Sequence, residues 1–232
     1  MIRIYPESSR YRAGQSWLTS RFSFSFGDYY DPDNTGFGPL RVLNDDIIQG
    51  GHGFGAHPHR EMEIVSIVLQ GRLRHEDSTG HTAETTFGGV RRMSAGTGII
   101  HSEVNPGEDD VHLLHLWFTP EIRGLEPSYE TSQYDPERMA NRLLPVVSDR
   151  SGEGIAHIHQ NLTIYLSKLE AGRQIDYVTG ADRRTYLFVI EGGLTVNGAS
   201  RLARRDSARI ENEPSLRLVA DEDVMFMLID MP

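Results

Sequence analysis

The sequence predicts an all-β protein built from two β-barrels in tandem. Short stretches rich in β-forming residues recur along most of the chain, and turn-forming Gly, Pro, Asn and Asp residues separate them. Helical periodicity is nearly absent, so only a few short helices are expected. A strand, a glycine turn and a second strand occur at Val68–Leu73 and again at Val189–Leu194, which we interpret as a weak internal repeat.

The expected strands lie in both halves of the chain. Phenylalanine alternates with polar residues at Arg21–Phe26, which indicates a half-buried strand with Phe22, Phe24 and Phe26 on one face. Val111–Phe118 is almost continuously apolar, as expected of a strand with both faces buried. Further strands are expected at Leu40–Ile48, Met62–Leu69, Leu73–Glu76, Leu162–Leu169, Arg184–Ile190, Leu194–Val196, Ala208–Ile210, Leu216–Val219 and Val224–Ile229.

A polar stretch divides the chain. Residues 119–142 contain three prolines and few apolar residues, and the β pattern resumes after them. We therefore place a domain boundary in this stretch, with residues 1–125 forming an N-terminal barrel and residues 126–232 a C-terminal barrel. One helical turn is expected at Pro136–Asn141.

Composition excludes several classes of protein and of site. The 232 residues include no cysteine, so disulfides and thiolate ligands are excluded and any metal site must use histidine and carboxylate. The net charge of −10 argues against direct binding of nucleic acid, because phosphate neutralisation requires a basic face. The sequence shows no apolar run of about 18 residues and no secretory signal, so we expect a cytoplasmic protein without a membrane span.

Two pairs of residues at positions i and i+2 carry metal-ligand chemistry: His57 with His59, and His101 with Glu103. Alternate residues of a strand point to the same face, so each pair can project together into a barrel. Pro58 stiffens the first pair because its ring fixes φ. Two such pairs on facing strands can bind one ion through three imidazole nitrogens and one carboxylate. This ligand set suits Fe(II), Mn(II), Ni(II), Co(II) or Zn(II), and it leaves two positions of an octahedral ion open.

The remaining histidines have ordinary interpretations. His157 and His159 form another same-face pair, but no histidine follows them, so we expect the C-terminal barrel to lack a metal site. His52 could line the mouth of a pocket, and His115 lies in a strand that is expected to line the barrel. Hydrogen-bonded core or surface positions are expected for His75, His81 and His112. We expect Phe26, Phe54 and Met93 either to line the walls of the pocket or to pack in the core.

Four blocks of the sequence resemble the pirin family of the cupin superfamily. They are FSFGDYYDP at Phe24–Pro32, LRVLND at Leu40–Asp45, HPHREME at His57–Glu63 and MSAGTGIIHSE at Met93–Glu103. The resemblance extends over the length of the chain, although these specific motifs all lie before residue 106. It implies a bicupin, in which two tandem jelly-roll barrels are joined and only the N-terminal barrel holds a metal ion.

The cupin motifs show two departures from the general pattern. Gly96 stands where the second motif usually has a proline, and the leading glycine of that motif is offset, at Gly89. Pirin-like sequences share this looseness. In many cupins the glutamate of the first motif, here Glu63, is the carboxylate ligand, whereas in pirin-like proteins Glu103 has that role. Both lie at even spacing from a histidine, so spacing cannot choose; the resemblance implies Glu103.

The resemblance also implies an enzyme. Pirin-like proteins are associated with flavonol (quercetin) 2,3-dioxygenase activity, in which a flavonol is cleaved with dioxygen. Glu103 would then act as the base that takes the proton of the flavonol 3-hydroxyl. The metal is expected to be Fe(II), with Zn, Ni, Mn, Co or Cu as alternatives. A monomer is expected, because a bicupin already contains the barrel pair that single cupins form by dimerising.

Two other functions stay open at this point. Pirin-like proteins also resemble non-enzymatic regulators, in which the state of the metal changes a surface that binds a protein partner. The net charge of −10 favours a protein over bare DNA as that partner. Another cupin reaction, such as isomerisation or decarboxylation at the same metal, is excluded by no residue of the sequence. The sequence also leaves the native metal and the natural substrate undecided.

Overall fold

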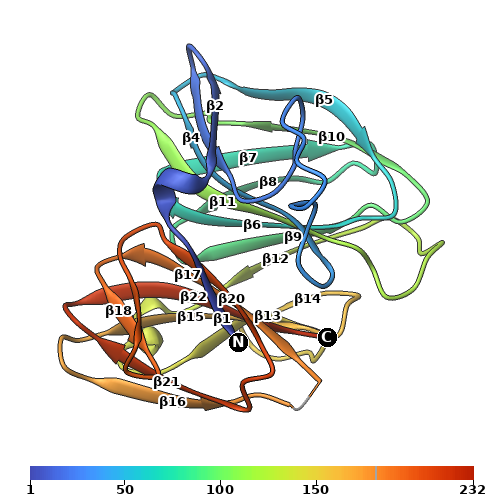
Figure 1. The fold of residues 1–232 in the computed structure, drawn as a ribbon. Helices are drawn as coiled ribbons and strands as arrows, with labels where there is room; N and C mark the ends of the chain where they lie inside the picture. Colours follow the sequence, from blue (N-terminus) through green and yellow to red (C-terminus); the bar gives the residue numbers. More distant parts are fainter. Residues whose placement is uncertain (181) are drawn as a thin grey trace. The chain divides into compact units, whose positions relative to one another are not determined.

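The computed structural model describes residues 1–180 and 182–232, and β-strands make up nearly all of its regular structure (Figure 1). The described residues contain only two short 3-10 helices, η1 (Glu7–Ser9) and η2 (Pro136–Met139). The η2 helix confirms the predicted helical turn, and the Asp135 carboxylate caps it by accepting a hydrogen bond from the Glu137 N–H. The all-β prediction is therefore confirmed. Across these described ranges, no helix is long and apolar enough to span a membrane.

Internal contacts divide the chain into two compact units. The N-terminal unit consists of residues 11–134 and 149–160, and the C-terminal unit of residues 1–10, 135–148 and 161–232. The division expected at residues 125 and 126 was contiguous in sequence, whereas each of these units includes a short segment from the other half of the chain. The linear domain boundary stays a prediction.

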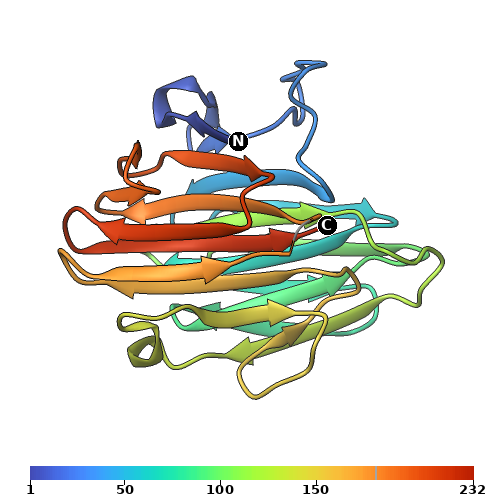
Figure 2. The ribbon, with the colours of Figure 1, turned by 60° about the horizontal axis from the view of Figure 1, so that its bottom comes forward.

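The larger sheet of the N-terminal unit is antiparallel (Figure 2). Its central strands have buried residues on both faces. The predicted apolar strand, β11, has six of its eight residues buried. In spatial order the sheet contains β12 (Ser128–Gln133), β9 (Gly89–Ser94), β6 (Glu63–Gln70), β11 (Val111–Phe118), β4 (Leu40–Ile48), β3 (Leu18–Phe22) and β2 (Tyr11–Gln15).

The smaller sheet of this unit carries the two predicted ligand pairs. In spatial order it contains β5 (Gly53–His59), β10 (Ile99–Val104), β7 (Arg72–Asp77) and β8 (Thr82–Thr86). Leu73 of this sheet packs in one apolar cluster with Val68 and Leu113 of the larger sheet, so the hydrophobic core joins the two sheets. The register of β5 against β10 shifts at the ligand pairs: His101 pairs with His57, but Glu103 pairs with Phe54. A β-bulge therefore separates the positions of His101 and Glu103 relative to β5.

The C-terminal unit has the same two-sheet plan. Its larger sheet contains β1 (Ile2–Tyr5), β20 (Ser207–Glu211), β17 (Arg184–Glu191), β22 (Val224–Met231), β15 (Thr163–Leu169) and β13 (Leu144–Ser148). Its smaller sheet contains β16 (Gln174–Val178), β21 (Ser215–Ala220), β18 (Leu194–Val196) and β19 (Ser200–Leu202). Leu187, Phe226 and Leu218 belong to the apolar cluster that both sheets bury. The strand β14 (Ala156–His157) lies in the segment 149–160.

The phenylalanine-rich strand ends earlier than predicted. β3 stops at Phe22, because the Ser25 N–H donates to the Asn34 carbonyl at 2.8 Å and the chain turns there. Phe22 and Phe26 line one pocket, whereas Phe24 is 1% exposed and does not line it. The prediction that the three rings share one strand face was therefore wrong for Phe24, since the pleat does not continue past Phe22.

The close approach of β5 to β10 gives a first prediction. A Cβ added at Gly53 would lie 2.2 Å from the Glu103 carbonyl oxygen, so Gly53→Ala must push the two strands apart. We expect this substitution to lower the free energy of unfolding by about 1–3 kcal/mol in urea denaturation. The matched control is Gly55→Ala on the same strand, where an added Cβ meets nothing within 4 Å. Equal stability of the two variants would contradict the tight β5–β10 contact.

Candidate metal centre

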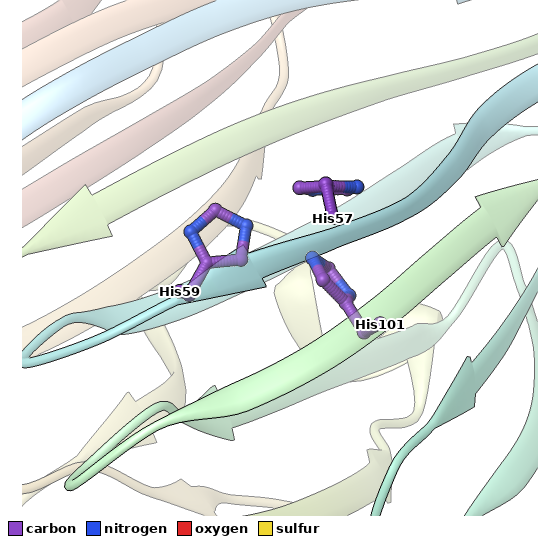
Figure 3. A group of neighbouring side chains, drawn as sticks. All are labelled: His57, His59 and His101. Atoms are coloured by element: carbon purple, nitrogen blue, oxygen red, sulfur yellow. The ribbon is translucent and has the colours of Figure 1, made fainter.

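Three histidines converge on the strand pair β5 and β10 (Figure 3). His57 and His59 lie two residues apart on β5, and His101 on β10 is paired with His57. The ring centroids are between 4.5 and 4.8 Å apart, and one nitrogen from each ring lies within 4.8 Å of the other two. Histidine nitrogens that bind one transition-metal ion each lie about 2.0–2.1 Å from it, so small side-chain adjustments suffice for all three to reach a common ion.

The free nitrogens of these rings fit a metal ligand set. The His57 Nδ1 lies 2.7 Å from the Gly55 carbonyl, which can only accept, so this nitrogen carries the hydrogen and Nε2 keeps its lone pair. The Nε2 atoms of His59 and His101 are buried and have no hydrogen-bond partner. Buried polar atoms without a partner are rare in folded proteins. A divalent ion bound by the three rings would satisfy both atoms.

Burial keeps the imidazoles of His59 and His101 neutral. It is the largest cause that lowers the pKa of His59 to about 4, and the charge of His57 adds to it. Burial also lowers the pKa of His101 strongly, and the charge of Arg91 is the next cause. A histidine binds metal only as the neutral imidazole. The lone pairs of both residues therefore stay available well below neutral pH.

Glu103 lines the same pocket as the three histidines, but side chains of the larger sheet hold its carboxylate. The Arg91 guanidinium forms an ion pair with Oε1, and the His115 Nε2 lies 2.9 Å from Oε2. The ligand atoms of Glu103 form a close group with His75 and His101 rather than with the full histidine trio. The structure thus brings three of the four predicted ligands together, and Glu103 as the fourth ligand stays a prediction.

Arg91 supplies the buried positive charge of the site. Its side chain is 1% exposed, and it donates a hydrogen bond to the Ser66 hydroxyl at 2.6 Å besides pairing with Glu103. Burial lowers the pKa of Arg91 to about 10, so the guanidinium is still charged at neutral pH. A buried cation without a carboxylate partner strongly destabilises a protein, so Arg91 and Glu103 depend on each other.

A polar row continues from Glu103 into the larger sheet. The His115 Nδ1 lies 2.6 Å from the Asp46 Oδ2, and the Ser20 hydroxyl donates to the other oxygen of the same carboxylate. Asp46 is 2% exposed and His115 6% exposed. Glu103 therefore faces a histidine that a second carboxylate orients.

The pocket beside the histidines has a cavity volume of about 240 Å³. Its polar wall includes Glu103, His115 and Asp46. Its apolar wall consists of Leu18, Phe22, Phe26, Phe54, Ile64 and Trp117. A mainly apolar pocket with a few convergent polar groups is typical of a small-molecule site. Phe26 and Phe54 are thus pocket residues, whereas Met93 packs in the hydrophobic core.

Comparison with known proteins agrees with this architecture. Residues 6–118 match the family described as Pirin, and residues 145–231 match the family described as Quercetinase C-terminal cupin domain. The chain is 38% identical to the quercetin 2,3-dioxygenase of Escherichia coli K12, over 100% of this chain and 99% of that protein. The chain belongs to the pirin family.

Solved pirin structures share the fold over the full length. The crystal structure of YhhW from Escherichia coli has a TM-score of 0.95 and 38% identity, and it covers 100% of this chain and 98% of that chain. A second structure of this bacterial pirin, in complex with nickel(II), has a TM-score of 0.94 and 37% identity, with coverage of 100% and 99%. The predicted bicupin fold is confirmed, and a pirin relative binds a divalent ion.

Glu63, the other candidate carboxylate of this pirin, has a structural role. It is 1% exposed and does not line the pocket. Its Oε2 accepts hydrogen bonds from the Ser94 hydroxyl at 2.8 Å and from the His159 backbone N–H at 3.1 Å. It therefore holds the segment 149–160 against β6 and β9. His52 is exposed and stacks on Trp17, and it does not line the pocket.

Sequence reasoning missed the polar residues that surround Glu103. Arg91 and Asp46 were not singled out, and His115 was expected only to line the barrel. The available signal was polarity inside apolar strands: Asp46 interrupts β4 and His115 interrupts β11.

Two groups of side chains in the described ranges could hold a metal ion: the three histidines, and the group of His75, His101 and Glu103. Both groups lie in the N-terminal unit. The absence of a metal from the C-terminal barrel stays a prediction.

The lowered histidine pKa values give a pH prediction for the metal-free protein. The pKa of His59 and of His75 falls to about 4, with burial as the main cause, from 6.5 in the absence of structure. Between these pH values the unfolded chain binds more protons than the folded one, so acidification through this range lowers the free energy of unfolding. Urea denaturation should show a flatter pH slope for His59→Phe than for the wild type. Ile122→Ala, a control at an exposed residue that does not titrate, should keep the wild-type slope, and equal slopes in all three would refute the assignment.

Proposed function

We propose that this pirin is a metal-dependent dioxygenase for flavonols of the quercetin type. The observation that carries the proposal is the convergence of three histidines, two of them with unpartnered buried nitrogens, at the wall of an aromatic-lined pocket. The full-length similarity to a quercetin 2,3-dioxygenase supports the same reaction class.

The proposed metal ligands are His57, His59, His101 and Glu103. One divalent ion, Fe(II) in our proposal, would act as a Lewis acid that favours the deprotonated flavonol and supports its reaction with dioxygen. Imidazole and carboxylate ligands accept several first-row ions, and nickel(II) is the ion bound by the Escherichia coli relative. Nickel is therefore the first alternative to iron.

The aromatic wall would orient a flat substrate. Phe26 packs edge-on against Trp117 with ring centroids 5.2 Å apart, and Phe54 packs edge-on against His115 with ring centroids 6.0 Å apart. Aromatic rings prefer stacked or edge-to-face contacts, which favour a planar polycyclic ligand over a flexible chain. The substrate would thus be held by its rings, with its hydroxyl groups toward the polar wall.

Glu103 is the proposed base for the flavonol 3-hydroxyl. Arg91 compensates the charge of the carboxylate, so Glu103 can remain ionised although it is only 4% exposed. The accepted proton can be shared with His115, whose Nε2 is 2.9 Å from Oε2 and whose other nitrogen is held by Asp46. These residues would retain the proton at the pocket wall while water is kept out by the apolar side chains.

Several further expectations accompany this proposal without a test in the structure. We expect the protein to be monomeric and cytoplasmic and to bind no nucleic acid, and these three properties stay predictions. Binding of a protein partner, as in a metal-dependent regulator, is the alternative function. No described contact favours that alternative over catalysis.

Turnover of quercetin tests the proposal. Fe(II) is loaded without oxygen, quercetin and air are added, and loss of flavonol absorbance is followed together with dioxygen uptake. We expect one ion per chain and steady turnover, and Glu103→Gln should lower the rate about 100-fold or more if it removes the base. The control, Glu76→Gln, makes the same change at a carboxylate that is 51% exposed on β7 and should keep the wild-type rate.

The metal content of Glu103→Gln separates its two proposed roles. Retained metal with lost turnover supports the base, and lost metal supports the ligand. Wild-type turnover with retained metal contradicts both roles. One ion per chain without flavonol loss above free iron, for the wild type, would refute the dioxygenase and favour the regulator.

A further inference from the structure

We propose that His75 and Asp77 fix the tautomer and the ring orientation of His101. Both lie on β7, the strand that pairs with β10, and neither lines the pocket. His75 is 0% exposed, and no step of the proposed reaction uses it. The inference deepens the proposed metal site and rests on it, but it does not depend on a flavonol as the substrate.

A row of contacts runs from Asp77 to His101. The His75 Nε2 lies 2.8 Å from the Asp77 Oδ2, and the His75 Nδ1 lies 3.3 Å from the His101 Nδ1. The strand register places Asp77 directly opposite His101. The His75 ring also stacks on Tyr129, with centroids 4.4 Å apart and planes at 15°. Strand pairing and stacking therefore fix both the position and the plane of the His75 imidazole.

Asp77 determines the direction of the hydrogen bonds along this row. Its Oδ1 accepts from the Thr79 N–H at 2.9 Å, from the Thr79 hydroxyl at 2.6 Å and from the His81 N–H at 3.3 Å. A carboxylate can only accept, so the His75 Nε2 carries the hydrogen that faces Oδ2. The Nδ1 of a neutral His75 is then an acceptor. The His101 Nδ1 must therefore carry a hydrogen and donate it to His75.

This arrangement leaves the lone pair of His101 on Nε2. That nitrogen is buried without a hydrogen-bond partner, as a metal ligand requires. In the opposite tautomer an N–H would occupy the direction of the metal–nitrogen bond. Carboxylates and carbonyl groups commonly orient metal-binding histidines in this way. In this chain a second histidine, His75, stands between the carboxylate and the ligand.

The same residues are poorly suited to a second metal position. Ligand atoms of His75, His101 and Glu103 lie within 4.8 Å of one another. The His75 Nδ1, however, faces the His101 Nδ1 at 3.3 Å and is already used in this row of contacts. Asp77 also holds one of the two His75 nitrogens, so His75 has a positioning role.

Histidine tautomers give the direct test. Long-range ¹H–¹⁵N spectra of the metal-free, full-length protein show which nitrogen of each labelled imidazole carries hydrogen, and we expect Nδ1–H for His101. In Asp77→Asn the amide oxygen stays with the three donors at Oδ1, so the NH₂ group faces His75 and reverses both tautomers. Asp176→Asn, the same change at an exposed carboxylate of the other unit, should leave the spectrum of His101 unchanged. Nε2–H on His101 in the wild type would overturn the proposal.

Nickel(II) affinity, measured by competition with a chromogenic chelator, gives a second readout. Asp77→Asn and His75→Phe should bind about 10–100-fold more weakly than the wild type. His75→Asn retains an acceptor near the position of Nδ1 and should bind more tightly than His75→Phe, which retains only the stacked ring. The reverse order would show that His75 acts by packing alone and would refute the positioning role. A wild type with the expected tautomer but no nickel binding would instead refute the proposed metal function.

Discussion

The candidate metal centre of the N-terminal unit depends on holding three imidazoles within one small volume. The ring centroids of His57, His59 and His101 lie less than 5 Å apart, and protonated rings at this distance would repel one another. Burial lowers the pKa of His59 and His101, and the close backbone contact between β5 and β10 supplies the short distance. The fold thereby presents lone pairs where a cation can bind, and it leaves buried nitrogens unsatisfied until one does.

The two carboxylates that line the pocket are each held by a basic side chain from another strand. Arg91 pairs with Glu103, and His115 lies against Asp46. Asp77 accepts a hydrogen bond from His75 on its own strand, β7, and burial lowers the pKa of His75 so that this imidazole is neutral. A site of this kind can keep a carboxylate ionised next to an apolar pocket, since the charge is balanced without water. The same balance makes each partner sensitive to removal of the other.

Sequence periodicity was sufficient for apolar strands such as β6, β11 and β22 and for the histidine pairs, because a period of two fixes which residues share a face. It gave no strand at β8 or β12, because these strands are polar and few of their residues are buried. It was insufficient wherever the pleat was interrupted: the turn after Phe22 removed Phe24 from the pocket, and the β5 bulge shifted Glu103 relative to His101. The partners of the site could not be predicted either. Asp46 and His115 are 69 residues apart, and only the register of β4 against β11 brings them together.

The most direct test of the account is anomalous diffraction from crystals of the full-length protein soaked in nickel(II) or grown with iron(II). The account predicts one strong peak per chain, at about 2.0–2.2 Å from a nitrogen of each of His57, His59 and His101. A peak at the other group, between His75 and Glu103, or no peak in the N-terminal unit, would contradict it.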